Sequence, residues 1–308
     1  MNDSRPLVSI GIPTFNRPES LRRSLSCICQ QIYPKLEIIV SDNASPGEET
    51  ERVVREYMAW DGRIQYTRQP TNLGPVANFQ FVLDAATGEY FMWMSDDDWR
   101  APTYIEALLR VLQDDKAAIL AFCDIAVLDE KGNRRSDFYR TYLPYLRPLA
   151  ASNAIVRLAR FFLQDENLGK ANLVYGLMRS EAIKAVPVGA LYEKYGFYGL
   201  DNLILFELLG KGRLRLVEDM LYGCTSGNVK HYPVVPDATA LKGRMYSIGR
   251  QLRYLLAYPR LSKGMMKIIL TTLFPLKLIM FYFHISKRKL SITSNPALPG
   301  KAEITRSE

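Results

Sequence analysis

The sequence predicts an α/β fold in which a mostly parallel sheet is covered by helices on both faces. Two observations carry this prediction: apolar, β-branched runs recur between residues 7 and 128, and a segment of helical periodicity separates each run from the next. Such alternation is typical of stacked β-α-β units. A third observation is that polar clusters stand where the runs end, which is the edge at which sheets of this kind bind ligands.

Five runs are expected to be strands, with four helices between them. The strand runs are rich in β-branched and aromatic residues, whereas the helical segments repeat apolar residues roughly every 3.6 positions. Two of the helical segments open on proline, which fits the first turn of a helix. The expected strands are 7–13, 36–42, 63–68, 89–95 and 117–128, and the expected helices are 18–32, 47–60, 74–86 and 102–113.

The second half of the chain has a less regular pattern, in which turn residues interrupt the apolar segments. The expected elements are, in order, a long loop over 131–150, a helix near 153–163, a strand at 172–179, a helix at 200–210 ended by Gly210, helices separated by Pro and Gly from about 236, and a short polar tail from Ser291.

The positive charge of the chain is concentrated near its C-terminus. The net charge is +8, yet residues 230–289 hold twelve Lys and Arg against one acid, Asp237, and no Asp or Glu occurs from Ala238 to Ala302. Such a block is typical of a chain that binds a polyanion, either nucleic acid or an anionic membrane surface. The basic residues alternate with Leu, Ile, Met and Phe, which favours the membrane surface over nucleic acid.

Residues 263–289 contain an apolar stretch close to the roughly 20 residues that span a membrane. Pro275 and Lys277 lie near its middle, and a central lysine costs about 2.5–3.5 kcal/mol on insertion. We therefore expect a helix lying in the membrane interface with its basic residues toward anionic headgroups. A span or re-entrant hairpin and a buried helix remain as alternatives. Five basic residues share roughly a third of the helical wheel: Lys263, Lys267, Lys277, His284 and Arg288.

Cysteine and histidine are scarce. The four cysteines form no C-x-x-C pair, and no secretory signal precedes the first strand run, so we expect reduced thiols in a cytosolic protein. Because the histidines are only two, His231 and His284, acid–base chemistry is expected to fall mostly on carboxylates, tyrosines or lysines.

Three consecutive carboxylates, Asp96, Asp97 and Asp98, follow the fourth strand run. Like charges about 4 Å apart repel by roughly 4 kcal/mol at an effective dielectric constant near 20, so a cation is expected beside them. The chain has neither a P-loop nor a dinucleotide fingerprint, and the spacing does not fit a calcium loop. Hard oxygen donors indicate Mg²⁺ or Mn²⁺ that bridges to a phosphate of the ligand. The alternative is a solvated turn that opens the next helix.

Polar clusters also follow the first three strand runs, at 13–17, 41–47 and 69–74. Each cluster alone is explained by a turn or a helix cap. Because the carboxyl ends of parallel strands meet at one edge, these clusters and 95–99 together favour a ligand crevice.

Four stretches, in this order and spacing, resemble the family 2 nucleotide-sugar glycosyltransferases of the GT-A fold: VSIGIPTFNR, IIVSDNAS, NLGPVANFQFVLDAATGEYFMWMSDDDWRAP and GLDNLILFELLGKGR. The resemblance covers roughly residues 7–230 and implies a Rossmann-like domain, a nucleoside-diphosphate sugar donor and a divalent metal. Ser95 stands where the commoner Asp-x-Asp-Asp pattern has its first acid. The implied nucleotide-binding residues are Pro13, Thr14, Phe15, Asn16, Asp42, Asn72, Asn78 and Asp96, and the implied metal ligands are Asp96, Asp97, Asp98 and His231.

The resemblance also implies a catalytic base for the acceptor hydroxyl, and Asp201 stands where the family places it. Leu200 replaces the glutamate that often precedes this acid. The alternative reading of Asp201 is an N-cap of the apolar helix that follows. The nearby aromatic residues Tyr195, Phe197 and Tyr198 are expected either to form a platform for the acceptor sugar or to pack in the core.

The expected activity is transfer of one sugar per encounter from a nucleoside-diphosphate sugar to a glycan or lipid-linked acceptor in cell-surface polysaccharide synthesis. The family position of Asp42 favours UDP, and the family's single displacement implies inversion at the anomeric carbon. We expect the enzyme to lie peripherally at the cytoplasmic face of the membrane. The rival functions are a metal-dependent phosphohydrolase and a non-catalytic membrane protein with a vestigial crevice. The expected units are a GT-A domain over 1–235, a basic helical segment over 236–292 and a flexible tail over 293–308.

Overall fold

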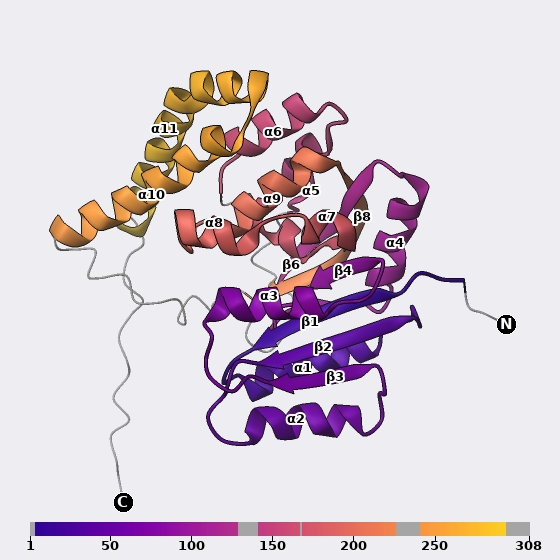
Figure 1. The fold of residues 1–308 in the computed structure, drawn as a ribbon. Helices are drawn as coiled ribbons and strands as arrows, with labels where there is room; N and C mark the ends of the chain where they lie inside the picture. Colours follow the sequence, from indigo (N-terminus) through magenta and orange to yellow (C-terminus); the bar gives the residue numbers. More distant parts are fainter. Residues whose placement is uncertain (1–3, 129–140, 167, 226–240, 294–308) are drawn as a thin grey trace, which may run out of the picture.

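The central layer of the protein is a single mixed sheet with helices on both sides (Figure 1). The computed structural model describes residues 4–128, 141–166, 168–225 and 241–293, and within them the sheet has eight strands in the order β3-β2-β1-β4-β7-β6-β8-β5. The strands are β1 (Val8–Thr14), β2 (Leu36–Asp42), β3 (Ile64–Arg68), β4 (Tyr90–Trp93), β5 (Trp99–Arg100), β6 (Ala118–Leu128), β7 (Leu177–Arg179) and β8 (Arg213–Thr225).

The direction of the strands places the carboxyl ends of the first four at one edge. Strands β3, β2, β1 and β4 run parallel, and their register sets Thr14 opposite Asp42 and Asp42 opposite Arg68. The short strand β7 runs antiparallel between β4 and β6, β8 runs parallel to β6, and β5 runs antiparallel to β8. The predicted mostly parallel α/β sheet is confirmed.

The helices that cover the sheet bury an apolar side against it. Helix α4 shows the pattern, because its buried residues recur with helical spacing at Ile105, Leu108, Leu109 and Leu112. The helices are α1 (Pro18–Cys29), α2 (Glu49–Met58), α3 (Pro75–Ala85), α4 (Tyr104–Asp114), α5 (Leu143–Leu146), α6 (Ala154–Leu163), α7 (Ser180–Lys184), α8 (Val188–Tyr195), α9 (Leu200–Lys211), α10 (Leu241–Leu261) and α11 (Gly264–Thr293), with 3₁₀ helices η1 (Arg147–Ala150) and η2 (Lys170–Tyr175).

A glycine in β1 lets α3 lie close to the sheet beside the strand ends. A Cβ added at Gly11 would be 2.6 Å from Cγ2 of Val82 in α3, which is closer than real side chains approach one another. The close approach fixes α3 over the ends of β1 and β2, where the candidate site lies.

Several predicted boundaries in the second half of the chain are wrong. The strand expected at 172–179 is mostly η2, and only Leu177–Arg179 is a strand. Helix α9 continues past Gly210 to Lys211, and Gly212 follows it. Strand β8 was not expected, because Arg213, Arg215 and the acids after them interrupt its apolar pattern. The two-residue strand β5 and the helices α7 and α8 were not expected either, and the second half of the loop expected over 131–150 contains α5 and η1.

The two C-terminal helices pack on the α/β body beside α6, α8 and α9 (Figure 1). Ser262 and Lys263 separate them, and Gly264, with φ of 53°, begins α11. Pro259 and Pro275 lie inside α10 and α11 instead of ending them. A proline removes one backbone donor, and packing against neighbouring elements keeps these helices continuous. The tail expected from Ser291 begins inside α11, and residues 294–308 lie outside the described residues.

The orientation of α11 corrects the helical-wheel prediction for Lys277. Its side chain is buried rather than directed at headgroups, with 2% of the residue exposed. The Lys277 Nζ lies 3.0 Å from Oε1 of Glu166 and donates to the Gln164 carbonyl oxygen at 2.8 Å. A buried ammonium is tolerated when it is paired in this way. The side chains of His284 and Arg288 lie outside the described residues.

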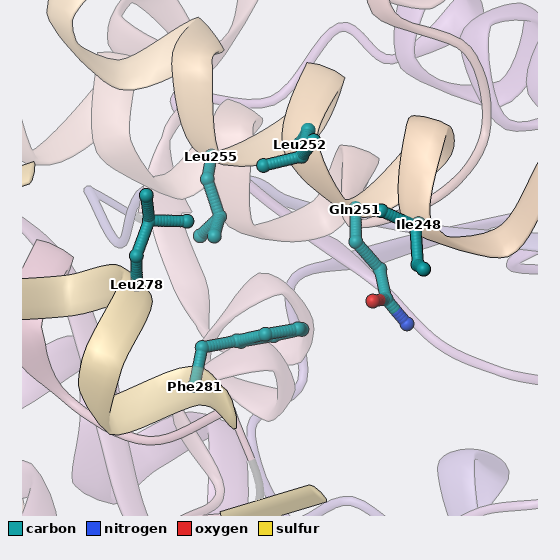
Figure 2. A pocket seen from close by; sticks show the side chains of 6 residues that line it. All are labelled: Ile248, Gln251, Leu252, Leu255, Leu278 and Phe281. Atoms are coloured by element: carbon teal, nitrogen blue, oxygen red, sulfur yellow. The ribbon is translucent and has the colours of Figure 1, made fainter. Parts of the chain in front are cut away.

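The seam between α10 and α11 is lined by apolar side chains and by Gln251. Figure 2 shows Leu255, Leu278 and Phe281 directed into it, with Leu252 on the α10 side. This seam and the Lys277 ion pair together fix the rotation of α11 about its own axis. One side of the helix therefore faces the protein and the opposite side is left without a protein partner in the described chain.

Candidate active site

The four polar strand-end clusters meet at one edge of the sheet, as the sequence predicts. Thr14 Oγ1, at the end of β1, donates to Oδ2 of Asp96 beyond β4 at 2.8 Å. The backbone N–H of Asn16 donates to Ser45 Oγ beyond β2 at 2.7 Å. Asn43 Nδ2 donates to Oδ1 of Asn72 beyond β3 at 2.9 Å. Hydrogen bonds thus join all four clusters into one rim.

Two of the expected nucleotide-binding residues are buried beneath this rim. Asp42 is 1% exposed, and its carboxylate accepts hydrogen bonds from the Ser45 backbone N–H at 2.9 Å and from the Tyr66 hydroxyl at 3.1 Å. Asn78 is also buried, and its Nδ2 donates to the carbonyl oxygen of Ser41 at 3.0 Å. These side chains hold the loops after β1 and β2 in place.

The other expected nucleotide-binding residues differ in exposure. Phe15, Asn16 and Asn72 are exposed at the top of the rim, whereas Pro13 and Thr14 are buried in β1. Among the described residues, Asn16 and Ala44 are the only ones other than glycine with positive φ, at 53° and 60°. Strained backbone of this kind is concentrated at ligand sites in proteins, and here both residues lie in loops of the rim.

The carboxylates Asp96 and Asp97 face one guanidinium. Arg17, in the loop after β1, donates from Nη1 to Oδ1 of Asp96 at 2.6 Å and from Nη2 to Oδ2 of Asp97 at 2.5 Å. The fork geometry of arginine suits such paired acceptors. Burial nevertheless raises the pKa of Asp96 to about 6, with Arg17 opposing the shift. Arg17 thus supplies one positive charge beside the triplet, in addition to any metal ion.

Asp98 points away from the rim into the protein. Its Oδ2 accepts a hydrogen bond from the Tyr222 hydroxyl at 3.1 Å and lies 3.7 Å from Nη1 of Arg100. The Arg100 guanidinium is buried between two aromatic rings, 4.1 Å from the centroid of Tyr222 and 5.1 Å from that of Tyr104. Burial raises the pKa of Asp98 to about 7, and Arg100 opposes the shift. Asp98 is therefore integrated into the core beneath the rim.

The donor set at the rim fits a divalent cation. Asp96 and Asp97 present adjacent carboxylate oxygens, which are the donors that Mg²⁺ and Mn²⁺ prefer. Arg17 now neutralises both, and a dication would share or replace this contact. Within the described residues, no three Asp, Glu, His or Cys side chains converge on one point, because Asp98 is turned inward. His231 lies outside the described residues.

Asp201 lies in the first turn of α9 and has no hydrogen-bond or ion-pair partner among the described residues. The residue at the N-cap is Gly199, so Asp201 is not the N-cap. Its side chain is open to solvent, yet the protein around it displaces enough water to raise its pKa from 3.8 to about 6. An accessible, unpaired carboxylate with a raised pKa has the properties of a general base.

The residue after Asp201 connects α9 to the C-terminal helix. Asn202 Nδ2 donates to Oε2 of Glu166 at 3.3 Å. The same carboxylate pairs with the buried ammonium groups of Lys170, at 2.8 Å, and of Lys277 in α11. One partly buried carboxylate, that of Glu166, thus links the helix that carries Asp201 to α11.

The position of Asp201 depends on a glycine that no other residue can replace without strain. Gly199 has φ of 71°, and a Cβ there would lie 2.4 Å from ring carbons of Tyr254 in α10. We expect Gly199→Ala to destabilise the protein by about 1–3 kcal/mol more than Gly47→Ala. Gly47 is the control, since its φ of 73° is close to that of Gly199 but nothing lies within 4 Å of an added Cβ, which leaves only the backbone cost of the positive φ, about 1–2 kcal/mol. Urea unfolding of both variants measures the difference, and equal losses would contradict this account of Gly199.

The aromatic residues before α9 divide between the core and the surface. Tyr195 is buried in the core, whereas Phe197 is exposed. Tyr198 packs edge-on against Tyr254, with ring centroids 5.5 Å apart. The core alternative therefore holds for Tyr195, Tyr198 is partly buried against the core, and Phe197 is the exposed residue of the three.

Comparison with known proteins decides the family. The family described as Glycosyl transferase family 2 matches residues 9–175, which is more than half of the chain. The chain belongs to glycosyltransferase family 2. The match spans β1 to β4 with the whole rim, and it continues through β6 to the end of η2.

Curated relatives of this family 2 glycosyltransferase are similar to it over part of their length. One is named GalNAc(5)-diNAcBac-PP-undecaprenol beta-1,3-glucosyltransferase, from Campylobacter jejuni, and is 32% identical over 43% of this chain and 42% of its own. An uncharacterised glycosyltransferase of Methanocaldococcus jannaschii is 30% identical over 44% of this chain and 47% of its own. The matches thus span less than half the length of these relatives.

Solved structures confirm the GT-A fold. S. aureus TarS 1-349 in complex with UDP-GlcNAc superposes with a TM-score of 0.53 at 16% identity, over 80% of this chain and 66% of that one. The mannosyltransferase PcManGT from Pyrobaculum calidifontis, in complex with GDP-Man and Mn2+, gives a TM-score of 0.51 at 17% identity, over 87% and 69%. At such identities the likeness establishes the fold of the family 2 domain alone.

Two arginines at the site of this glycosyltransferase were not predicted from the sequence. Arg17 belongs to the first polar cluster, and Arg100 stands two residues after the triplet. The three adjacent acids were the signal that could have pointed to these arginines, because adjacent negative charges require positive charges beside them. Both arginines also stand in the sequence next to segments of the rim. It did not show that Arg17 would face outward and Arg100 inward.

Proposed function

We propose that the protein transfers a single sugar from a nucleoside-diphosphate sugar, with UDP as the nucleotide, to a lipid-linked glycan acceptor. The observation that carries the proposal is the rim itself, where four strand-end clusters join around Asp96, Asp97 and Arg17. Two proteins of the same fold are named as complexes with UDP-GlcNAc and GDP-Man, which supports a nucleotide sugar as the donor.

The donor is proposed to bind with its nucleoside over the loops after β1 and β2 and its diphosphate toward the carboxylates. Asp42 and Asn78 shape the floor of this site, while Phe15, Asn16 and Asn72 are proposed to contact the nucleoside from the rim. Asp96 and Asp97 are the residues that would hold Mn²⁺ or Mg²⁺, with Asp98 and His231 as the remaining predicted ligands. A bound dication would neutralise the diphosphate as it leaves.

Asp201 is proposed as the catalytic base. Its carboxylate takes the proton of the acceptor hydroxyl as that oxygen forms a bond to the anomeric carbon of the donor. The bond from this carbon to the diphosphate oxygen breaks, and the nucleoside diphosphate departs with the electron pair. A single displacement inverts the configuration at the anomeric carbon. Arg17, which contacts Asp96 and Asp97, is proposed to attract the negative charge of the diphosphate.

The acceptor and location are proposed from two further observations. The Campylobacter relative is named for an undecaprenol-diphosphate-linked substrate. Helix α11 contains a segment, Gly264–Phe281, that is long and apolar enough to cross a membrane by length and composition. We propose peripheral attachment at the cytoplasmic face of an anionic membrane, in the synthesis of a cell-surface polysaccharide.

A transfer assay tests this function. The full chain is incubated with UDP-, GDP- or dTDP-sugars and a polyprenyl-diphosphate-linked glycan, and the glycolipid is analysed by mass spectrometry and NMR. We expect the mass of the glycolipid to increase by one sugar residue, joined with the anomeric configuration opposite to that of the donor. Release of free sugar or sugar phosphate without a coupled product would instead indicate the rival phosphohydrolase.

A further inference from the structure

Helix α11 has an outward stripe of apolar residues without a protein partner among the described residues. The outward stripe is Met265, Ile268, Thr272, Pro275, Leu276 and Ile279. Its four large apolar residues are 66%, 69%, 46% and 54% exposed, in chain order. Their successive spacings of three, eight and three positions place them on one side of the helix. In the candidate membrane segment that includes this stripe, 17% of the residues are buried.

The rotation of α11 that exposes the outward stripe is fixed by contacts on the opposite side. There Lys277 pairs with Glu166, Leu270 is fully buried, and Leu278 and Phe281 line the seam with α10. These contacts also argue against a membrane span. A helix surrounded by lipid would have to break the Lys277–Glu166 pair and leave both charges in an apolar medium.

The polar groups near the outward stripe do not oppose burial in lipid. The hydroxyl of Thr272 donates to the Ile268 carbonyl oxygen at 3.0 Å, and that of Thr271 donates to the Lys267 carbonyl oxygen at 2.8 Å. Both hydroxyls are therefore satisfied inside the helix and carry little cost when water is removed.

The charge of the neighbouring side chains distinguishes between two partners that could cover this stripe, a second copy of the chain and a lipid surface. The exposed charged side chains from Ile248 to Phe281 are Arg253, Arg260, Lys263 and Lys267, and all are positive. A second copy of the chain would bring like charges together at this face, which is unfavourable. An anionic lipid surface attracts each such residue by roughly 1 kcal/mol within a Debye length of about 10 Å.

We infer that α11 docks flat on an anionic bilayer through the outward stripe while Lys277 and the α10 seam keep it attached to the catalytic body. The apolar side chains enter the acyl boundary, and the basic residues remain in the headgroup layer. The protein thereby lies on the membrane without crossing it. This inference rests on the proposed membrane-associated function and specifies the surface that carries it.

Vesicle co-sedimentation of the full chain tests the inference. We expect binding to phosphatidylcholine vesicles that contain phosphatidylglycerol, weaker binding to phosphatidylcholine alone, and release at high salt or in alkaline carbonate. Ile279→Ser should weaken binding to the anionic vesicles by about tenfold, and Ile268→Ser/Ile279→Ser by more. The matched control is Ile32→Ser, since Ile32 and Ile279 are both 54% exposed and Ile32 lies outside α11, in the loop after α1. It should bind like the wild type.

Three results would overturn the inference. They are wild-type vesicle binding by the double variant, retention of the protein in the membrane after carbonate extraction, and a dimer in solution that the double variant dissociates. The assay requires no sugar transfer, so its failure is distinguishable from failure of the proposed activity. A protein that binds nucleotide but no vesicle would retain the enzymatic proposal and lose this one.

Discussion

Asp201→Asn lowers the kcat of sugar transfer by about 10²–10⁴-fold, the usual contribution of a positioned general base. Nucleotide binding is expected to stay unchanged, because Asp201 lies in the first turn of α9 and makes no hydrogen bond to any residue of the rim. Steady-state kinetics and nucleotide titration measure the two effects separately. Glu207→Gln is the matched control, since it removes a carboxylate charge from the same helix at a position not proposed to act.

The pH dependence of the reaction follows from the raised pKa of Asp201, which is about 6. A base must be ionised, so kcat should rise as pH passes upward through about 6 and level off above it. The effect on stability has the opposite sign. A raised pKa means that the folded protein favours the neutral carboxyl group of Asp201, so the contribution of this group to the free energy of unfolding is lost as pH rises through about 6. Asp201→Asn should therefore not destabilise the protein at neutral pH. Activity of Asp201→Asn within a few-fold of the wild type would exclude Asp201 as the base.

Arg100→Met is expected to cause the largest loss of stability, about 3–5 kcal/mol at pH 8, where Asp98 is ionised. The change leaves the buried Asp98 without its cation and removes the guanidinium from between Tyr104 and Tyr222. Urea unfolding measures the loss. In the double variant Asp98→Asn/Arg100→Met, the loss in free energy of unfolding should be smaller than the sum of the two single losses. The reason is that Asp98→Asn removes the carboxylate charge that Arg100→Met leaves unpaired.

The loss caused by Arg100→Met should shrink at lower pH. The pKa of Asp98 is raised to about 7, and removing Arg100 raises it further, so both the wild type and the variant hold a neutral Asp98 near pH 5.5. The ion pair is then absent from both proteins. A loss of equal size at pH 5.5 and pH 8 would show that Arg100 acts through packing alone.

The order of elements and the rim could be predicted from the sequence because both depend on local patterns. Strand and helix periodicity located β1 to β4 and α1 to α4, and parallel strands bring their carboxyl ends together without further information. The interrupted apolar pattern of β8 concealed a strand that is central to that half of the sheet. Two-residue β5 is too short to carry any periodicity at all.

Long-range ion pairs could not be predicted, because the order of charges along the sequence does not show toward which part of the fold each side chain points. Asp98 and Asp97 are neighbours in sequence, yet one faces Arg100 in the core and the other faces Arg17 at the rim. Lys277 lies on the basic side of a helical wheel, but its partner Glu166 comes from the α/β body. The wheel defines which residues share a side of α11, and only the tertiary fold shows which side faces the protein.

Calorimetric titration of nucleotide tests the central claim most directly. UDP, GDP and dTDP are each titrated with Mn²⁺ or with EDTA into the wild type, Asp96→Asn/Asp97→Asn and the exposed control Asp84→Asn. We predict that UDP binds the wild type and the control in the presence of Mn²⁺, and that EDTA or the double substitution abolishes this binding. Failure of all three nucleotides to bind the wild type with Mn²⁺ present would contradict the proposal that this rim is a nucleotide-sugar site.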